Sequence, residues 1–125
     1  MAVRMGPDSL GWIGGRVEAR IEELLESEVE RWAALDVDLL EPLRALQRLI
    51  RAGGKRLRPA FCHWAFVAAG GDPEAQLVVD AGAALELLHT FALIHDDVMD
   101  GSVRRRGKDT VHLTFESRHA EGAWR

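Results

Sequence analysis

Residues 81–100 read AGAALELLHTFALIHDDVMD, and this segment decides the fold class. Up to residue 94 it is apolar at all but three positions, without the period-two alternation of a strand. Four polar side chains fall within about a quarter turn of one another at the roughly 100° per residue of a helix: Glu86, His89, Asp96 and Asp100. Because unpaired carboxylates are costly to bury, we predict a largely buried helix whose polar stripe faces a hydrated cavity or bound ions.

Two amphipathic helices are predicted before this segment. Over residues 17–35 apolar side chains recur at spacings of three and four, and glutamates occupy most other faces, which indicates a surface helix. Leucines repeat in the same way over residues 39–50, where Pro42 is tolerated only in a first turn. Gly53 and Gly54 then end this helix, since glycine readily adopts the left-handed geometry of a helix C-terminus.

A third, short helix is predicted to begin at Pro59 and to end at Gly70 and Gly71. It is apolar nearly all round, which indicates burial on every side. Asp72 and Pro73 provide a cap and a first position for the fourth helix, which continues through the segment quoted above.

The remaining residues complete an all-α prediction. Residues 101–108 form a polar, cationic loop, and residues 111–115 begin another helix. The sequence has no repeat of fixed period and no low-complexity run. We therefore predict long antiparallel helices joined by short, glycine-marked turns.

Composition limits the function classes. The 125 residues suit one small globular domain, with 47% hydrophobic and 29% charged residues. Sixteen basic against twenty acidic residues give a net charge of -4, which argues against a general nucleic-acid binder. The single cysteine, Cys62, allows no internal disulfide and suits a reducing compartment. The longest uncharged segment, residues 59–71, is too short to span a membrane, and residues 1–15 lack a signal-peptide core, so we expect a cytoplasmic protein without a membrane span.

The sequence DDVMD at residues 96–100 indicates a metal site. Asp96 and Asp100 are one helical turn apart, about 5–6 Å between Cβ atoms, and could hold Mg²⁺ together with phosphate oxygens. Three aspartates at a helix C-terminus oppose the helix dipole, so local stability does not explain them. The basic residues at 104–108 follow at once, as a magnesium-diphosphate site requires. The alternatives are a solvated acidic helix end and a salt-bridged or nucleic-acid-facing loop.

A second basic element, GGKRLRP at residues 53–59, lies at another helix junction. Its glycines allow close approach of a ligand, and Lys55 and Arg58 could bind a second phosphate group. Taken alone, this element reads as a helix C-cap with solvated cations. His89 lies on the polar stripe and is a candidate phosphate or water contact, although a lone histidine on an apolar helix is more often a core residue.

Three motifs together resemble those of the trans-prenyltransferases, the polyprenyl diphosphate synthases: GGKRLRP at 53–59, ELLHTFALIHDDVMD at 86–100 and RRG at 105–107. The resemblance covers nearly all of residues 16–125. It implies the all-α isoprenoid synthase helical bundle, usually a homodimer. Residues 1–125 would be the N-terminal part of one such domain, because the family's second aspartate-rich motif is absent from this sequence.

The resemblance also implies residue roles in a magnesium-dependent condensation of isopentenyl diphosphate with an allylic diphosphate. Asp96 and Asp100 would bind Mg²⁺, with Asp97 supporting them through water, and Arg105 would bind the allylic diphosphate. Isopentenyl diphosphate would be bound by four residues: Lys55, Arg58, His89 and Arg106. The product implied is a C20 chain, with C15 as the alternative, because bulky Phe91 and small Ala92 precede a DDVMD motif without insertion.

Two departures from the family pattern qualify these expectations. Asp109 stands where the family usually has proline, which should alter only the loop. Without the second aspartate-rich motif we expect residues 1–125 alone to be inactive, marginally stable and prone to associate. The alternatives are a non-catalytic diphosphate-binding or partner subunit of a heteromeric synthase, and an unrelated magnesium- or nucleic-acid-binding helical bundle.

Overall fold

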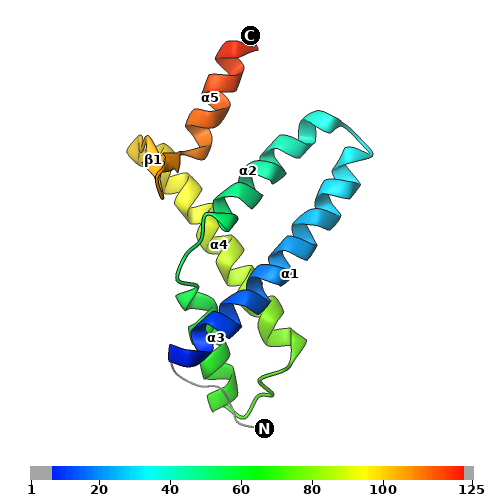
Figure 1. Cartoon of the computed structure of the whole chain (residues 1–125), viewed down its shortest axis with the longest axis vertical. Coiled ribbons are helices and arrows are strands. Elements are labelled where there is room, and N and C mark those ends of the chain that lie inside the picture. Colours follow the sequence, from blue (N-terminus) through cyan, green and yellow to red (C-terminus); the bar gives the residue numbers. More distant parts are fainter. Residues whose placement is uncertain (1–6, 123–125) are drawn as a thin grey trace.

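The computed structural model describes residues 7–122 and confirms the all-α class (Figure 1). Five α-helices, one 3-10 helix (η1) and a two-stranded hairpin follow one another along the chain: α1 (Pro7–Ala33), η1 (Val37–Leu39), α2 (Leu40–Arg51), α3 (Leu57–Ala68), α4 (Gln76–Asp100), β1 (Arg104–Arg105), β2 (Lys108–Asp109) and α5 (Val111–Glu121). All but the last residue of the hairpin, Asp109, lies within residues 101–108, which were predicted as a loop. It pairs Arg104 with Asp109 and Arg105 with Lys108 in antiparallel register.

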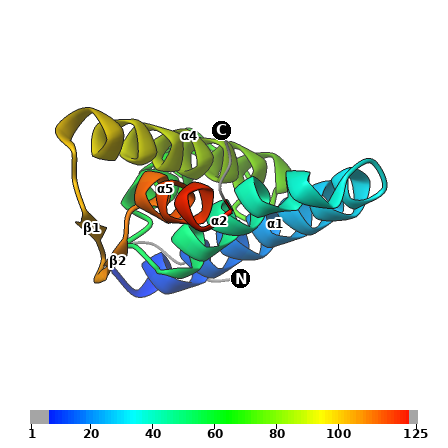
Figure 2. The same ribbon diagram turned by 90° about the horizontal axis from the view of Figure 1, so that it is seen from above.

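Helix α4 is the central element of the packing. It packs against α3 and α1, and α1 in turn packs against α2 and α3. Figure 1 shows α1 and α2 side by side, with α3 beside the first half of α1. Figure 2 shows the hairpin extending from the end of α4 and returning the chain to α5. An ion pair of 2.7 Å between Arg118 of α5 and Glu41 of α2 ties the last helix to the rest.

The hydrophobic core lies where α1 meets α2 and α4, and the amphipathic prediction for α1 is confirmed. Five buried residues form this core: Val17, Ile21, Leu25, Ile50 and Ala83. The three from α1 are spaced by four residues, so they share one face of the helix. Glutamates on the other faces pair with arginines, as in the bidentate contact of Glu22 with Arg51 at 2.7 Å.

Three helices cross at Gly82 of α4. A Cβ atom at this position would lie 3.0 Å from Val17 Cγ2 and 3.3 Å from Pro59 Cβ. Such contacts are tight, so the missing side chain is what allows α1, α3 and α4 to approach at one point. Pro59 itself lies in the first turn of α3, where its missing N–H leaves no helical hydrogen bond unmade.

The sequence predicted the ends of the helices, which glycines mark, better than it predicted the start of the fourth helix. Gly53 and Gly70 both have positive φ, at +91° and +93°, and follow helix ends as predicted. The predicted start of the fourth helix is wrong. Asp72 accepts a hydrogen bond of 2.9 Å from the backbone N–H of Glu74, so it stabilises a turn, and α4 begins at Gln76.

The all-round burial that the apolar sequences of α3 and α4 indicate is not reached in this chain, and part of their apolar surface is exposed, as expected for residues 1–125 alone. Phe61 of α3 is 64% exposed, and Leu88, Phe91 and Met99 of α4 are exposed as well. In the described part of the chain, α3 and α4 pack mainly on each other and on α1, which leaves their outer faces open. The association expected from such apolar surface stays a prediction.

Within residues 7–122, α4 is also the one helix whose length and mean hydropathy would suffice to cross a membrane. A buried helix in the core of a soluble protein has the same composition. This property alone is therefore weak evidence, and it does not show a membrane span.

His63 gives the fold a pH-dependent element that the sequence did not reveal. The ring is 3% exposed, lies edge-on to Trp12 at 5.4 Å, and its Nε2 has no hydrogen-bond partner among the described residues. Burial, and then the charge of Arg16, lower the pKa of His63 below its ordinary value of 6.5.

The free energy of unfolding should therefore fall as the pH drops below the ordinary histidine pKa of about 6.5, because the unfolded chain binds a proton that folded His63 resists. The loss should level off below the depressed pKa of the folded state. Urea unfolding between pH 5 and 8 measures this slope. His63→Gln should make it shallower, and an unchanged slope in that variant would assign the pH dependence elsewhere.

Candidate functional site

The GGKRLRP turn is built around a buried arginine, Arg56, for which no role was predicted. Arg56 has a left-handed backbone, with φ of 51°, and its side chain is 4% exposed. Each of its guanidinium nitrogens donates a hydrogen bond: Nε to Glu18 at 2.9 Å, Nη1 to Glu86 at 2.5 Å and Nη2 to the carbonyl of Ile50 at 2.7 Å. This one side chain connects the turn to α1, α4 and α2.

Four of the sequence-predicted site residues meet beside this turn. They line, with four further residues, a cavity of about 200 Å³, which we name the cationic cavity. Its lining consists of Gly54, Lys55, Arg56, Leu57, Arg58, Glu86, His89 and Arg106. Lys55 and Arg58 come from the turn, His89 from α4 and Arg106 from the hairpin. Segments about 50 residues apart in sequence thus present to one space an imidazole and three cationic side chains that have no ion-pair partner within residues 7–122.

Because Gly54 has no side chain, two guanidinium groups can lie close to this turn. A Cβ atom at Gly54 would lie 3.1 Å from Nη2 of Arg106 and 3.1 Å from Nη1 of Arg56. Arg106 also has a left-handed backbone, with φ of 52°, at the tip of the hairpin. The glycine therefore leaves the space in which the hairpin arginine reaches the cavity.

The electrostatics of the cationic cavity favour an anion. Burial is the main cause that lowers the pKa of His89, and the positive charge of Arg58 lowers it further. Glu86 acts in the opposite direction, and Arg106 and Arg105 add to the lowering. His89 is therefore neutral at pH 7, and a bound anion would raise its pKa.

The aspartates of the DDVMD motif divide into two kinds. Asp96 and Asp100 are exposed at the end of α4, just before Gly101 ends the helix with φ of 64°. Asp97 is 3% exposed and accepts two hydrogen bonds of 2.7 Å from Nε and Nη2 of Arg105. The sequence placed Asp97 in support of the metal through water, whereas the structure pairs it directly with the hairpin.

The pair leaves Arg105 open to a second partner. Its side chain is 29% exposed, and Asp97 occupies only the Nε and Nη2 edge of the guanidinium. The Nη1 amino group remains available to a phosphate oxygen, because a guanidinium carries five donors in a planar fork. Asp97 thus fixes Arg105 at the same helix end at which Asp96 and Asp100 lie.

The described residues provide fewer converging side chains for a metal ion than for an anion. No group of three or more His, Cys, Asp or Glu side chains within residues 7–122 is arranged to hold a metal. Mg²⁺ in phosphate-binding sites commonly uses only one or two carboxylates and completes its octahedron with water and phosphate oxygens. The exposed carboxylates of Asp96 and Asp100 match that donor set.

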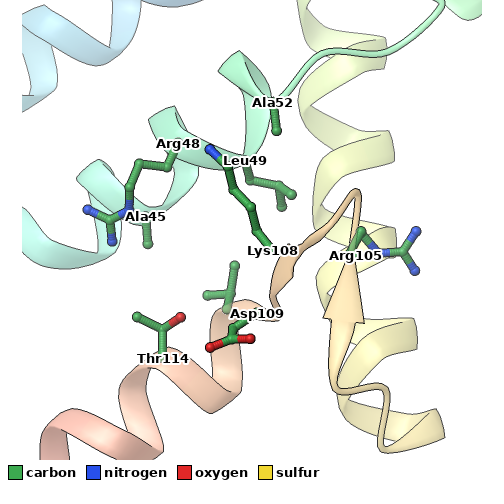
Figure 3. Close-up of a pocket in the computed structure, with 9 residues that line it drawn as sticks. Ala45, Arg48, Leu49, Ala52, Arg105, Lys108, Asp109 and Thr114 are labelled. Atoms are coloured by element: carbon green, nitrogen blue, oxygen red, sulfur yellow. The ribbon is translucent and has the colours of Figure 1, made fainter.

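A second cavity, of about 150 Å³, lies between α2, the hairpin and α5 (Figure 3). Its lining is mainly apolar, with Arg48, Lys108 and Asp109 at its edges. Arg48 is paired with Glu41 at 2.7 Å. In Figure 3 Arg105 points away from this cavity, and Lys108 extends toward the end of α2. Of the residues that line this cavity, Arg105 and Lys108 belong to the basic segment 104–108 that was predicted to accompany a diphosphate site.

Asp97→Asn should loosen the hairpin. The variant removes the charge that holds Arg105, and losing hydrogen bonds to a charged group costs about 1.5–3 kcal/mol. Amide hydrogen exchange should become faster at residues 102–110 while the core of α1 stays protected. Asp109→Asn is the matched control, because its contact with Arg104 is 3.9 Å long and exposed. Equal exchange in the two variants would contradict a role for the Asp97 pair.

Fold and site together define an all-α protein in which an aspartate-rich helix end lies beside a cationic cavity. A sequence model of the polyprenyl synthetase family matches residues 41–121, which include every site residue described above. The chain belongs to this family.

Three relatives illustrate the similarity. The short chain isoprenyl diphosphate synthase of Methanothermobacter thermautotrophicus is 51% identical over 73 residues, which are 58% of this chain and 22% of that protein. The geranylgeranyl pyrophosphate synthase of Geoglobus acetivorans is 38% identical over 102 residues, 79% of this chain and 28% of its own length. The heterodimeric geranylgeranyl pyrophosphate synthase large subunit 1, chloroplastic, of Arabidopsis thaliana is 45% identical over 89 residues, 66% of this chain and 24% of its own length.

The chain thus spans about a quarter of the length of the curated relatives it matches. No solved structure matches it significantly.

Proposed function

We propose that this chain supplies the isopentenyl diphosphate pocket and one metal-binding wall of a short-chain prenyl diphosphate synthase. The observation that carries the proposal is the convergence of Lys55, Arg58, His89 and Arg106 on one cavity. That cavity lies one hairpin away from the exposed carboxylates at the end of α4. Two separate anion-binding regions are what a reaction between two diphosphates needs.

The cationic cavity binds the diphosphate of isopentenyl diphosphate. Arg58 and Arg106 offer planar forks of donors to phosphate oxygens, and Lys55 adds a compact point charge. Neutral His89 donates one N–H to the same group. The cavity orients the substrate and does not itself take part in bond breaking.

The allylic diphosphate binds at the end of α4. Asp96 and Asp100 would hold Mg²⁺, and the bound ion would supply positive charge to stabilise the leaving diphosphate. Arg105, fixed by Asp97, donates to the same diphosphate. The metal assignment rests on the donor chemistry of the two carboxylates and on the family.

The reaction follows from these positions. The allylic C–O bond breaks, and the diphosphate leaves with the electron pair. The double bond of isopentenyl diphosphate then forms a new C–C bond to the allylic cation. A proton is lost from the adduct, with the departing diphosphate as acceptor. The apolar face of α4, with Leu88 and Phe91, is exposed in this chain and would exclude water from the cation once another apolar surface covers it.

A binding experiment tests the pocket. Isopentenyl diphosphate should bind the wild-type chain without magnesium, measured by isothermal titration calorimetry. A Lys55→Ala/Arg58→Ala variant should bind it at least about tenfold more weakly, since each removes a charge-assisted hydrogen bond. Lys108→Ala is the matched control, because Lys108 lines the other cavity. Equal weakening by the control would mean that only net charge attracts the ligand.

We also propose a C20 product, with Phe91 as the residue that stops chain growth. Phe91 is 57% exposed on the apolar face of α4, about one turn before the aspartates, so its ring stands in the space that a growing chain would enter. Phe91→Ala should lengthen the product of the active enzyme, measured by chromatography of the dephosphorylated prenols. Unchanged chain lengths would place the stop at another residue.

The assembly that we propose is a cytoplasmic homodimer, which rests on the family and on the single cysteine. The second candidate function is a subunit of a heteromeric synthase, which the similarity to a heterodimeric large subunit favours. Sedimentation equilibrium with and without a candidate partner subunit distinguishes the two assemblies.

A further inference from the structure

Glu86 is the one carboxylate among the residues that line the cationic cavity. Its side chain is 5% exposed, so water screens its charge poorly. An uncompensated negative charge at this position would repel any anion that enters. The cavity therefore needs a partner for Glu86 that the ligand does not compete for.

Arg56 has the geometry of that partner. Its shortest contact joins Nη1 to Oε1 of Glu86 at 2.5 Å, and both side chains are at least nine-tenths buried. Glu18 and the Ile50 carbonyl occupy its other two nitrogens. Because all three nitrogens are engaged, Arg56 is held by the protein, in contrast to the neighbouring Lys55 and Arg58, which are exposed.

We propose that Arg56 is a positioning residue that neutralises Glu86, so that the cavity presents Lys55, Arg58 and Arg106 as uncompensated positive charges. This inference rests on the proposed function, since it concerns the same cavity. It differs from a direct contact: Arg56 acts through Glu86, and its own guanidinium does not touch the diphosphate.

Affinity for inorganic diphosphate in magnesium-free buffer tests the inference through a double-mutant cycle. Arg56→Gln leaves Glu86 uncompensated and should weaken binding on the order of tenfold. Glu86→Gln should bind diphosphate at least as tightly as the wild type. The double variant Arg56→Gln/Glu86→Gln should return to within about threefold of wild-type affinity. A double variant as weak as Arg56→Gln would overturn the proposal, because it would mean that Arg56 contacts the anion or acts only on the fold.

The titration of His89 gives a second readout that needs no ligand. Nuclear magnetic resonance should show its pKa rising in Arg56→Gln and falling in Glu86→Gln, because Glu86 raises that pKa and would act more strongly without Arg56. Arg58, Arg106 and Arg105 also act on His89 and stay unchanged in both variants. A wild-type chain that binds no diphosphate but shows these shifts would refute the proposed function and leave the role of Arg56 standing. Absent shifts would refute that role alone.

Two further variants separate charge from folding. Arg56→Lys keeps the charge and should preserve both the affinity and the His89 titration, even if Arg56→Gln fails to fold. Arg20→Gln is the matched control, since it removes another arginine that joins α1 to a carboxylate of α4, Asp80, at 2.7 Å. It should leave diphosphate affinity unchanged. Loss of affinity in Arg56→Lys would contradict the proposal.

Discussion

Asp96→Ala is expected to lower prenyl-transfer turnover by about 10²–10³-fold, the effect typical of removing one group that stabilises charge in a transition state. Without Asp96, Mg²⁺ would lose a protein ligand and would be held less firmly where it would neutralise the leaving diphosphate. Asp96 is exposed at the end of α4 and has no ion pair in the described structure, so the substitution should leave stability nearly unchanged. Incorporation of isopentenyl diphosphate by the active enzyme at limiting magnesium measures the effect.

Asp109→Ala is the control for this experiment. Asp109 is also an exposed aspartate near the hairpin arginines, but it lies on β2, outside the DDVMD motif. We expect turnover close to that of the wild type. If Asp96→Ala retained wild-type turnover at limiting magnesium, the assignment of the metal to the end of α4 would be wrong.

Ile21→Ala is expected to cost about 2–5 kcal/mol of unfolding free energy, as large-to-small changes in a packed core do. Ile21 is 0% exposed and lies at the centre of the cluster that joins α1 to α2 and α4. The remaining structure cannot collapse into the space without moving a helix. Since small domains are stable by only about 5–15 kcal/mol, this single change removes a large share of the total.

Chemical denaturation followed by circular dichroism measures this loss. Leu35→Ala is the matched control, because Leu35 is 71% exposed and its removal should change stability by less than about 0.5 kcal/mol. Similar losses in the two variants would contradict the core described for α1.

The sequence predicted the fold class and most helix ends, because those depend on local chemistry. Gly53, Gly70 and the segment up to Asp100 behave as their residue types require. The start of α1 was not predicted, since Gly11, Gly14 and Gly15 look like helix breakers. In the structure α1 nevertheless runs through all three glycines from Pro7, because the burial of Ile13 and Val17 in its first half depends on tertiary contacts that local propensity does not include.

The sequence singled out most residues that line the candidate site, but it did not predict the contacts between them. Lys55, Arg58, His89 and Arg106 were assigned by resemblance, and their meeting in one cavity depends on how α3, α4 and the hairpin pack. The pairing of Asp97 with Arg105 could not be deduced from motif spacing, because it depends on a hairpin that turns back onto α4. Sequence patterns likewise gave no sign of which basic residue of GGKRLRP would be buried.

The crossing at Gly82 has a mechanical consequence for the chemistry. Asp96 follows Gly82 by fourteen residues in the same helix, so the aspartates lie about 21 Å along α4 from the crossing. Tilting α4 by about 5° about the crossing at Gly82 would move the carboxylates by roughly 2 Å. Since displacements of about 1 Å can cost a hundredfold in rate, the packing at the Gly82 crossing would determine how precisely the proposed metal ligands, Asp96 and Asp100, are positioned.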